Sequence, residues 1–216
     1  MSDVPDQSNA ASPSFVSRAG GKLLHALTTF GADVTGLRCA DFGCNVGGFT
    51  DCLLQAGASH VYAVDTGYGT LAYTLRSDDR VTVMERTNAL HCDPPDDLVD
   101  LVVIDLAWTP QRHALPAALR WLKADGMILT LVKPHYELDS EEKKTLLVDG
   151  RLAHDEAERI LSRVCEHMPE WGFEPLEWTR SPMTGRKSSK GRKRKGVVGP
   201  GNVEFIVHAR PVSDPS

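Results

Sequence analysis

Short apolar runs alternate with amphipathic segments along most of the chain, and this alternation limits the possible folds more than any other feature. Helical spacing of apolar residues is found over residues 20–30, 47–55, 115–122 and 153–167. Five apolar runs are typical of buried strands: residues 37–42, 61–64, 81–84, 98–104 and 127–132. Strands that alternate with helices predict a parallel sheet covered on both faces.

Two further strands are predicted at residues 173–178 and 203–208, with no helix between them. Because a Gly-rich basic stretch joins them, we expect these two strands to pair antiparallel. We also expect Gly126 to form a turn before the fifth strand and Pro134 to end that strand. The pattern therefore predicts an α/β fold with a mostly parallel seven-stranded sheet, helices on both faces and an antiparallel last strand.

The length of 216 residues suits one domain, which we expect over residues 15–210, between a disordered tail at 1–14 and a short tail at 211–216. No apolar run approaches the roughly 20 residues that span a bilayer. Residues 1–14 also lack the apolar centre of a signal peptide, so we expect a cytoplasmic protein without membrane contact. The five cysteines show no C-x-x-C spacing, which favours reduced thiols over zinc ligands or disulfides.

The charge is distributed unevenly, although the net charge of -5 gives no sign of this. Seven basic residues lie within a predicted loop at 185–201: Arg186, Lys187, Lys190, Arg192, Lys193, Arg194 and Lys195. Without them the chain would carry 17 basic and 29 acidic side chains. Such a run in an acidic chain favours binding to nucleic-acid phosphates, while a solvated loop or a localisation-like patch remains the alternative.

The residues after the first predicted strand are small and rich in glycine, with the sequence DFGCNVGGFT at 41–50. Glycines at a strand-to-helix turn let the backbone approach a ligand closely. Neither the lysine of a G-x-x-x-x-G-K-[ST] phosphate loop nor a G-x-G-x-x-G spacing is found there. A tight turn without a ligand is the alternative interpretation.

Polar residues stand at the ends of the next three predicted strands. Asp65 follows the second strand, about 20 residues after the glycines, where a carboxylate can accept hydrogen bonds from ribose hydroxyls. Asn88 follows the third strand, where an amide can read an adenine edge, and Asp105 ends the fourth. Because ligands bind beyond the carboxyl ends of such strands, the set predicts a nucleoside-type cofactor, although each residue alone could be a solvated turn residue.

Several motifs together resemble the TlyA-type branch of the FtsJ-like RNA ribose methyltransferases. They are D-x-G-x-x-x-G-G-F-T-D-C-L-L-Q at 41–55, V-Y-A-V-D at 61–65, G-Y-G at 67–69, E-R-T-N at 85–88, V-I-D at 103–105, L-V-K-P at 131–134 and S-P-M-T-G at 181–185. The matches run in order over residues 15–208. The resemblance implies a Rossmann-like methyltransferase fold, S-adenosylmethionine as the cofactor, RNA as the partner and no metal.

The resemblance also implies roles for individual residues. The family's Lys-Asp-Lys-Glu tetrad falls on Lys22, Asp105, Lys133 and Glu204. Expected cofactor-binding residues are Asp41, Gly43, Cys44, Asn45, Gly47, Gly48, Phe49, Asp65, Thr66, Asn88 and Asp105. Arg18 and the seven basic loop residues are expected to bind RNA.

In this scheme Lys133 is the base that takes the proton of a ribose hydroxyl, while Asp105 and Glu204 orient the two ammonium groups. Each assignment has an alternative that needs no chemistry. Lys133 could be a solvated strand end, Lys22 a surface residue and Glu204 an exposed face of its strand. Asp105 differs from these, because a carboxylate after an apolar strand needs a partner when it is buried.

The sequence departs from the family pattern in several places, among them Cys44-Asn45-Val46, which replaces the commoner Ala-Ser-Thr, and the loop at 185–201, which is expanded with basic residues. Residues 106–110 read Leu-Ala-Trp-Thr-Pro instead of Val/Ile-Ser-Phe-Ile-Ser, which changes the expected acceptor pocket. An S4-type RNA-binding module has no counterpart before Phe15, and we expect the basic loop to compensate for it. Trp108 is a candidate to stack on a base, with core packing as the alternative. His135 and Tyr136 are candidates to line the pocket, with packing behind the residues that line it as the alternative.

The predicted function is therefore S-adenosylmethionine-dependent 2'-O-methylation of RNA, with ribosomal RNA as the expected substrate. A methyltransferase for a small molecule or a protein is one alternative, which the change at 106–110 favours. A non-catalytic RNA-binding assembly protein that keeps the cofactor pocket is another, against which the four tetrad residues argue.

Overall fold

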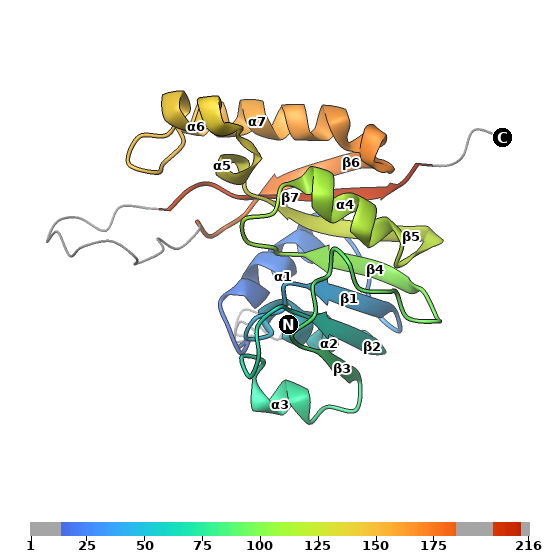
Figure 1. Cartoon of the computed structure of the whole chain (residues 1–216). Helices are drawn as coiled ribbons and strands as arrows, with labels where there is room; N and C mark the ends of the chain where they lie inside the picture. The colour runs from blue at the N-terminus through green and yellow to red at the C-terminus, as the bar shows by residue number, and fades with distance from the viewer. Residues whose placement is uncertain (1–13, 185–200, 213–216) are drawn as a thin grey trace, which may run out of the picture.

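The computed structural model describes residues 14–184 and 201–212 and contains one seven-stranded sheet in the order β3-β2-β1-β4-β5-β7-β6 (Figure 1). The strands are β1 (Arg38–Phe42), β2 (His60–Val64), β3 (Val81–Met84), β4 (Val99–Ile104), β5 (Leu122–Val132), β6 (Phe173–Arg180) and β7 (Phe205–Pro211). The helices are α1 (Ala19–Phe30), α2 (Gly48–Gln55), α3 (Tyr73–Arg76), α4 (Gln111–Leu119), α5 (Pro134–Glu137), α6 (Ser140–Leu146), α7 (His154–His167) and the 3-10 helix η1 (Met168–Trp171). The tail expected at 1–14 lies, apart from Ser14, outside the described residues.

Strands β1 to β5 pair parallel to one another, and β7 pairs antiparallel with both β5 and β6. The predicted seven-stranded sheet with its antiparallel last strand is therefore confirmed. Because β7 runs opposite to β5, Phe205 at its start lies beside Val132 at the end of β5. The residue before β7 is thus brought to the sheet edge where β1 to β5 end.

Helices cover both faces of the sheet, as the alternation of apolar runs predicts. On one face α1 and α2 pack on side chains such as Cys39, and on the other α4 and α7 pack on side chains such as Phe42. Successive strand residues point to opposite faces, so a strand buried on both sides must be apolar throughout. The fully buried Trp121 fills the α4 side of the core.

Helix α4 is the element that the sequence pattern predicted least well. It runs over Gln111–Leu119, not over 115–122, and contains Pro116. The turn expected at Gly126 is also wrong, because this residue lies within β5. A β-carbon at Gly126 would stand 3.0 Å from the Lys123 carbonyl oxygen and 3.1 Å from the Asp100 carbonyl oxygen, so crowding within β5 and against β4 explains the glycine. The register of β4 and β5 shifts at this point.

The ends of other elements also differ from the prediction. Strand β7 begins at Phe205, two residues after the predicted start, and reaches Pro211, one residue into the expected tail. Pro134 follows the end of β5 as predicted, but it also begins α5, since proline suits the first position of a helix. The short helices α3, α5, α6 and η1 were not predicted, because segments of four to seven residues carry little periodicity.

Candidate active site

The turn after β1 lies directly against the segment that follows β4. Gly43 has a φ of 92°, and a β-carbon there would stand 2.8 Å from the Asp105 carbonyl oxygen. Its backbone N–H donates to the Val64 carbonyl at the end of β2. Glycine is required at this position by both its backbone angle and the space available, so the ends of β1, β2 and β4 are held together.

Asp41 is fully buried near the end of β1 and holds the first turn of α2. One of its oxygens, Oδ2, accepts hydrogen bonds from the Thr50 backbone N–H at 2.9 Å and the Thr50 hydroxyl at 2.7 Å. Burial raises the pKa of Asp41 to about 7, and the nearby charge of Asp105 also raises it, against the lowering effect of Thr50. Its other oxygen, Oδ1, is buried without a hydrogen-bond partner among the described residues.

Asp65 lies at the end of β2 and closes the glycine-rich turn. Its Oδ2 accepts from the Asn45 backbone N–H at 2.9 Å, and its Oδ1 accepts from the Gly67 backbone N–H at 2.7 Å. The side chain is partly exposed. Each carboxylate oxygen has a second lone pair, so Asp65 can still accept two further hydrogen bonds.

The remaining residues predicted to bind a cofactor have different surroundings. Cys44 and Phe49 are buried in the α1 and α2 side of the core. A β-carbon at Gly48 would stand 2.9 Å from the Gly20 backbone nitrogen in α1, which shows that this glycine lets α1 and α2 approach. The exposed Asn88 accepts from the Leu90 backbone N–H. Cofactor contacts from these residues, and from Gly47 and Thr66, stay predictions.

Lys133 and Asp105 form an ion pair across the ends of β5 and β4. The Lys133 Nζ lies 2.6 Å from Asp105 Oδ1 and donates to the Leu106 carbonyl oxygen at 3.0 Å. Lys133 is 9% exposed, so it is not a solvated strand end. The partner that a carboxylate after an apolar strand requires is therefore this lysine.

Lys22 and Glu204 form a second ion pair at the same sheet edge. The Lys22 Nζ lies 2.5 Å from Glu204 Oε2, and the two residues are 6% and 4% exposed. The alternatives of a surface lysine and an exposed strand glutamate are therefore wrong. Glu204 directly precedes β7, and its carbonyl accepts from the Ser181 backbone N–H, which ties it to the end of β6.

Tyr136 lies close to both ion pairs, and its ring contacts the exposed ring of Trp108. Burial and then the charges of Glu204 and Asp105 raise the pKa of Tyr136. The Trp108 ring lies 4.9 Å from the Tyr136 ring at an interplanar angle of 30°, and Trp108 is 76% exposed with a φ of 59°. Core packing is therefore excluded for Trp108. The His135 ring lies 4.2 Å from the Tyr136 ring at an interplanar angle of 49°, and burial together with the charge of Lys133 lowers the pKa of His135 to about 4.

The base of the basic loop adjoins the start of α1. The Arg18 Nη2 donates to the Thr184 carbonyl at 3.3 Å, and the Gly201 backbone N–H donates to the Thr184 hydroxyl at 3.1 Å. The two ends of the loop thus meet near the helix that carries Lys22. The seven basic residues themselves, from Arg186 to Lys195, lie outside the described residues.

Within residues 14–184 and 201–212, no group of three His, Cys, Asp or Glu side chains is arranged to hold a metal ion. No helix of the described part is long and apolar enough to cross a membrane. The model for FtsJ-like methyltransferases matches residues 15–190 of this sequence. The chain belongs to the FtsJ-like methyltransferase family.

Similar proteins agree with this assignment. The methyltransferase is 38% identical over 204 residues to TlyA of Mycobacterium tuberculosis, a 16S/23S rRNA (cytidine-2'-O)-methyltransferase, covering 93% of this chain and 70% of the relative. It is 33% identical to Hemolysin A of Brachyspira hyodysenteriae, covering 90% of this chain and 76% of the relative. A solved structure from Streptococcus thermophilus, provisionally named a hemolysin, has a TM-score of 0.82 at 32% identity, over 96% of this chain and 70% of that one. The predicted family and fold are confirmed.

The cofactor of this methyltransferase is S-adenosylmethionine, and the residues at the sheet edge fit it. Asp65 offers two free lone pairs, as the two ribose hydroxyls of an adenosyl group require. The buried, unpartnered Oδ1 of Asp41 is a further acceptor in the same region. The ion pairs of Lys133 and Lys22 lie at the same edge of the sheet as these two carboxylates.

Three polar residues shape this site without having been assigned a role from the sequence. Thr50 donates a hydrogen bond from its hydroxyl to Asp41; it belongs to the motif at 41–55, but no role of its own was predicted for it. Glu85 accepts from the backbone of Gly69 and pairs with Arg76, which lowers the pKa of Glu85 to about 2. Glu137 binds the start of α4. The position of Glu85 directly after a strand was a usable signal, whereas the contact of Glu137 depends on the tertiary fold.

Proposed function

We propose that this methyltransferase transfers a methyl group to a ribose 2'-hydroxyl of ribosomal RNA. The observation that carries the proposal is the meeting of Lys22, Asp105, Lys133 and Glu204 as two ion pairs beside the cofactor-binding edge. The TlyA relative of Mycobacterium tuberculosis, named as an rRNA (cytidine-2'-O)-methyltransferase, supports the same substrate class. A substrate in the ribosome also implies a cytoplasmic location.

In this proposal Lys133 first releases its own proton to solvent, and its neutral amine then takes the proton of the attacking 2'-hydroxyl. The hydroxyl oxygen bonds to the methyl carbon as the bond between that carbon and sulfur breaks, which leaves the neutral thioether. S-adenosylmethionine supplies a methyl group on a positively charged sulfur, and a protonated hydroxyl is a poor nucleophile for it. The Lys133 amine is aimed by Asp105 and by the Leu106 carbonyl, so the lysine has one orientation at the reaction site. A positioned base contributes about 10²–10⁴-fold to the rate.

Lys22 and Glu204 complete the acceptor side of the site. Their ion pair is buried, so its field is weakly screened by solvent. Glu204 is placed there by β7, whose first residue pairs with Val132 at the end of β5, and Lys22 is placed there by α1. We assign to this pair the orientation of the ribose hydroxyl toward Lys133.

RNA contacts are assigned to Arg18, to the basic loop and to Trp108. Arg18 lies at the base of the loop, and Trp108 presents its ring to solvent beside the catalytic lysine. An exposed aromatic ring offers a stacking surface for an unpaired base. Because Tyr136 supports the Trp108 ring from behind, the two form a pre-arranged surface next to Lys133.

The proposal is tested by the transfer of labelled methyl from S-adenosylmethionine to unmodified ribosomal subunits, with Lys133→Ala as the test variant. Lys123→Ala is a matched control, because Lys123 also joins β5 to β4 through an aspartate but at the opposite end of the strands. A 2'-O-methyl group protects its own phosphodiester from alkaline cleavage. We expect resistant label with wild type and Lys123→Ala, and none with Lys133→Ala.

Other outcomes would replace the proposal. Label on RNA that stays sensitive to alkali would move the methyl group to a base. Label on a small molecule or a protein, with none on RNA, would favour the alternative acceptor. Bound cofactor without transfer to any of these would favour a non-catalytic RNA-binding role.

A further inference from the structure

Helix α4 begins at Gln111 with a cap supplied from another part of the chain. Both carboxylate oxygens of Glu137 accept from the Gln111 backbone N–H, at 3.1 and 3.2 Å. The residue before the helix is Pro110, whose side chain cannot cap it. The first N–H groups of a helix have no hydrogen-bond acceptor within the helix. Glu137 supplies the acceptor that no side chain next to the start of α4 provides.

The side chain of Gln111 ties the same point to the end of β5. Its Oε1 accepts from the Thr130 hydroxyl at 2.7 Å, and its Nε2 donates to the Leu131 carbonyl at 3.4 Å. Gln111 is 3% exposed and Thr130 is fully buried. The start of α4 is therefore attached to β5 by Gln111 and to α5 by Glu137, and we call these contacts the Gln111–Glu137 clamp.

The clamp joins the two segments that carry the reacting groups. Asp105, Leu106 and Trp108 lie on the stretch between β4 and α4, which the clamp fixes at its far end. Lys133 and Tyr136 lie at the end of β5 and in α5. The Lys133–Asp105 ion pair and the contact between the Trp108 and Tyr136 rings both join these two segments, as the clamp does.

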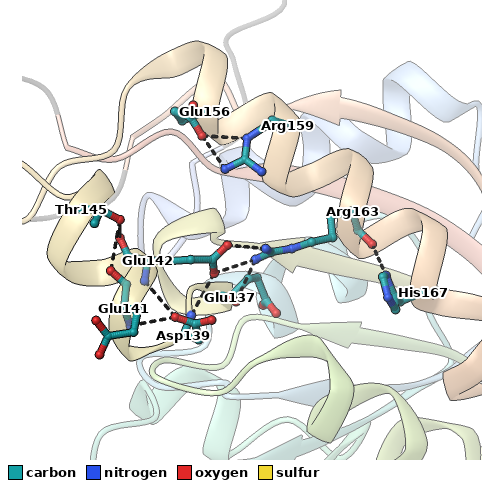
Figure 2. Close-up of polar contacts among 9 residues, drawn as sticks. All are labelled: Glu137, Asp139, Glu141, Glu142, Thr145, Glu156, Arg159, Arg163 and His167. Atoms are coloured by element: carbon teal, nitrogen blue, oxygen red, sulfur yellow. Dashed lines mark hydrogen bonds and ion pairs between the residues drawn. The ribbon is translucent and has the colours of Figure 1, made fainter.

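Helix α7 supports the clamp from the outside. The Arg163 Nη2 donates to the Glu137 carbonyl, and the same guanidinium pairs with Glu142 at the start of α6 (Figure 2). Asp139 accepts from the Glu142 backbone N–H and closes a capping box there. The short helix α5 is thereby held on both sides, although four residues cannot form a stable helix by themselves.

We propose that Gln111 and Glu137 are positioning residues for methyl transfer, acting by holding the segment after β4 in register with Lys133 and Tyr136. The inference rests on the proposed reaction at the Lys133 site. The two residues would not touch the substrate. Their effect would be on the placement of the base and of the Trp108 ring.

The test compares Gln111→Met, Glu137→Leu and Glu137→Gln with wild type. The first two variants keep the buried volume but remove the acceptor or donor groups. Glu137→Gln keeps a carbonyl oxygen that can still accept from the Gln111 backbone. Glu141→Gln is the matched control, because Glu141 lies nearby on α6 with a side chain that is 80% exposed.

Two readouts are measured on the same proteins. The first is kcat for methyl transfer together with cofactor affinity. The second is the fluorine NMR signal of Trp108 in protein labelled with 5-fluorotryptophan, assigned by its loss in Trp108→Phe. The second readout needs no substrate, so it tests the clamp even if the acceptor is not an RNA ribose.

We expect Gln111→Met and Glu137→Leu to lower kcat by about 10- to 100-fold, because small misplacements of reacting groups have effects of that size. Cofactor affinity should stay within about twofold of wild type, and the Trp108 signal should move or broaden. Glu137→Gln and Glu141→Gln should resemble wild type in both readouts.

A Trp108 signal and kcat that are unchanged in both Gln111→Met and Glu137→Leu would overturn the proposal. A parallel loss of kcat and cofactor affinity would also overturn it, since it would show a general effect on folding. If Glu137→Leu fails to fold, the comparison of Gln111→Met with Glu137→Gln and wild type still tests the proposal. Absence of transfer by wild type would instead count against the proposed function alone.

Discussion

The side chains of Lys22 and Glu204 meet at 2.5 Å although 182 residues of chain separate them. Both are buried, and each is the main charged partner that the structure provides for the other. Removing one member of a buried ion pair leaves an unpaired charge in a poorly solvated place. We therefore expect the pair to matter to folding as well as to the catalysis proposed for it.

We expect Lys22→Met and Glu204→Leu each to lower the free energy of unfolding by about 3–5 kcal/mol. The double variant Lys22→Met/Glu204→Leu should recover most of this loss, because no charge is left unpaired, while methyl transfer stays abolished. Urea unfolding and single-turnover transfer measure the two effects. A double variant as unstable as the sum of the single ones would show that the pair is not coupled.

Replacing Asp65 by Asn should weaken S-adenosylmethionine binding by about 10- to 100-fold, the usual value of hydrogen bonds to a charged group. The amide keeps one acceptor oxygen but loses the second and the charge. Calorimetric titration gives the dissociation constant. Asp97→Asn is the control, since the Asp97 side chain is 81% exposed and forms a long 3.7 Å ion pair with Arg38. Equal affinity of both variants would remove Asp65 from the cofactor site.

Asp41 should make the stability of the protein depend on pH. Its pKa is about 7 in the folded chain against an ordinary value of 3.8, so between these values the unfolded chain is ionised while the folded chain keeps its proton. The contribution of Asp41 is therefore fully present below about pH 4, falls as pH rises and is lost above about pH 7. Glu137, whose pKa burial also raises to about 7, acts in the same direction.

Asp41→Asn removes the titrating group and should flatten this dependence. The variant should gain stability relative to wild type as pH rises from 4 to 7, by up to about 4 kcal/mol. Urea unfolding at a series of pH values measures the difference. Parallel curves for the two proteins would mean that Asp41 titrates alike in the folded and unfolded states.

The basic run should determine how RNA binding responds to salt. Replacing its seven Lys and Arg residues by Gln should weaken binding and make the plot of log affinity against log salt shallower, by about 0.7 for each phosphate of single-stranded RNA that the variant no longer neutralises. Filter binding at several salt concentrations gives the slope. Lys144→Gln/Arg159→Gln, on the exposed faces of α6 and α7, is the control. An unchanged slope would show that the run does not bind phosphates.

Much of the fold could be predicted because buried parallel strands leave a strong local signal. The run that ends at Ile104 is continuously apolar apart from Asp100, and its strand was placed within one residue. Helix α4 was misplaced because its start depends on Glu137, whose carboxylate is 26 residues away in the chain. Gly126 was misread as a turn because it lies within β5, where the register with β4 shifts and a β-carbon would be crowded by both strands.

The residues of the candidate site also divide into those that a local sequence pattern reveals and those that it does not. Asp65 and Asp105 were found from their positions at strand ends, which is a local property. Lys22 and Glu204 could not be found in this way, since neither a helix residue nor a residue before the last strand is distinctive in sequence. The family resemblance supplied them, and the ion pair then gave the physical reason for their burial.

The place of β7 between β5 and β6 has a consequence for the order in which the protein matures. Strands β1 to β5, with Asp41, Asp65 and Asp105, are synthesised first and pair among themselves. Strand β6 must wait for β7, which is made last, and Glu204 arrives with it. A nascent chain therefore contains Asp41, Asp65 and Asp105 before it contains Glu204, and the Lys22–Glu204 ion pair can form only after the start of β7 has been synthesised.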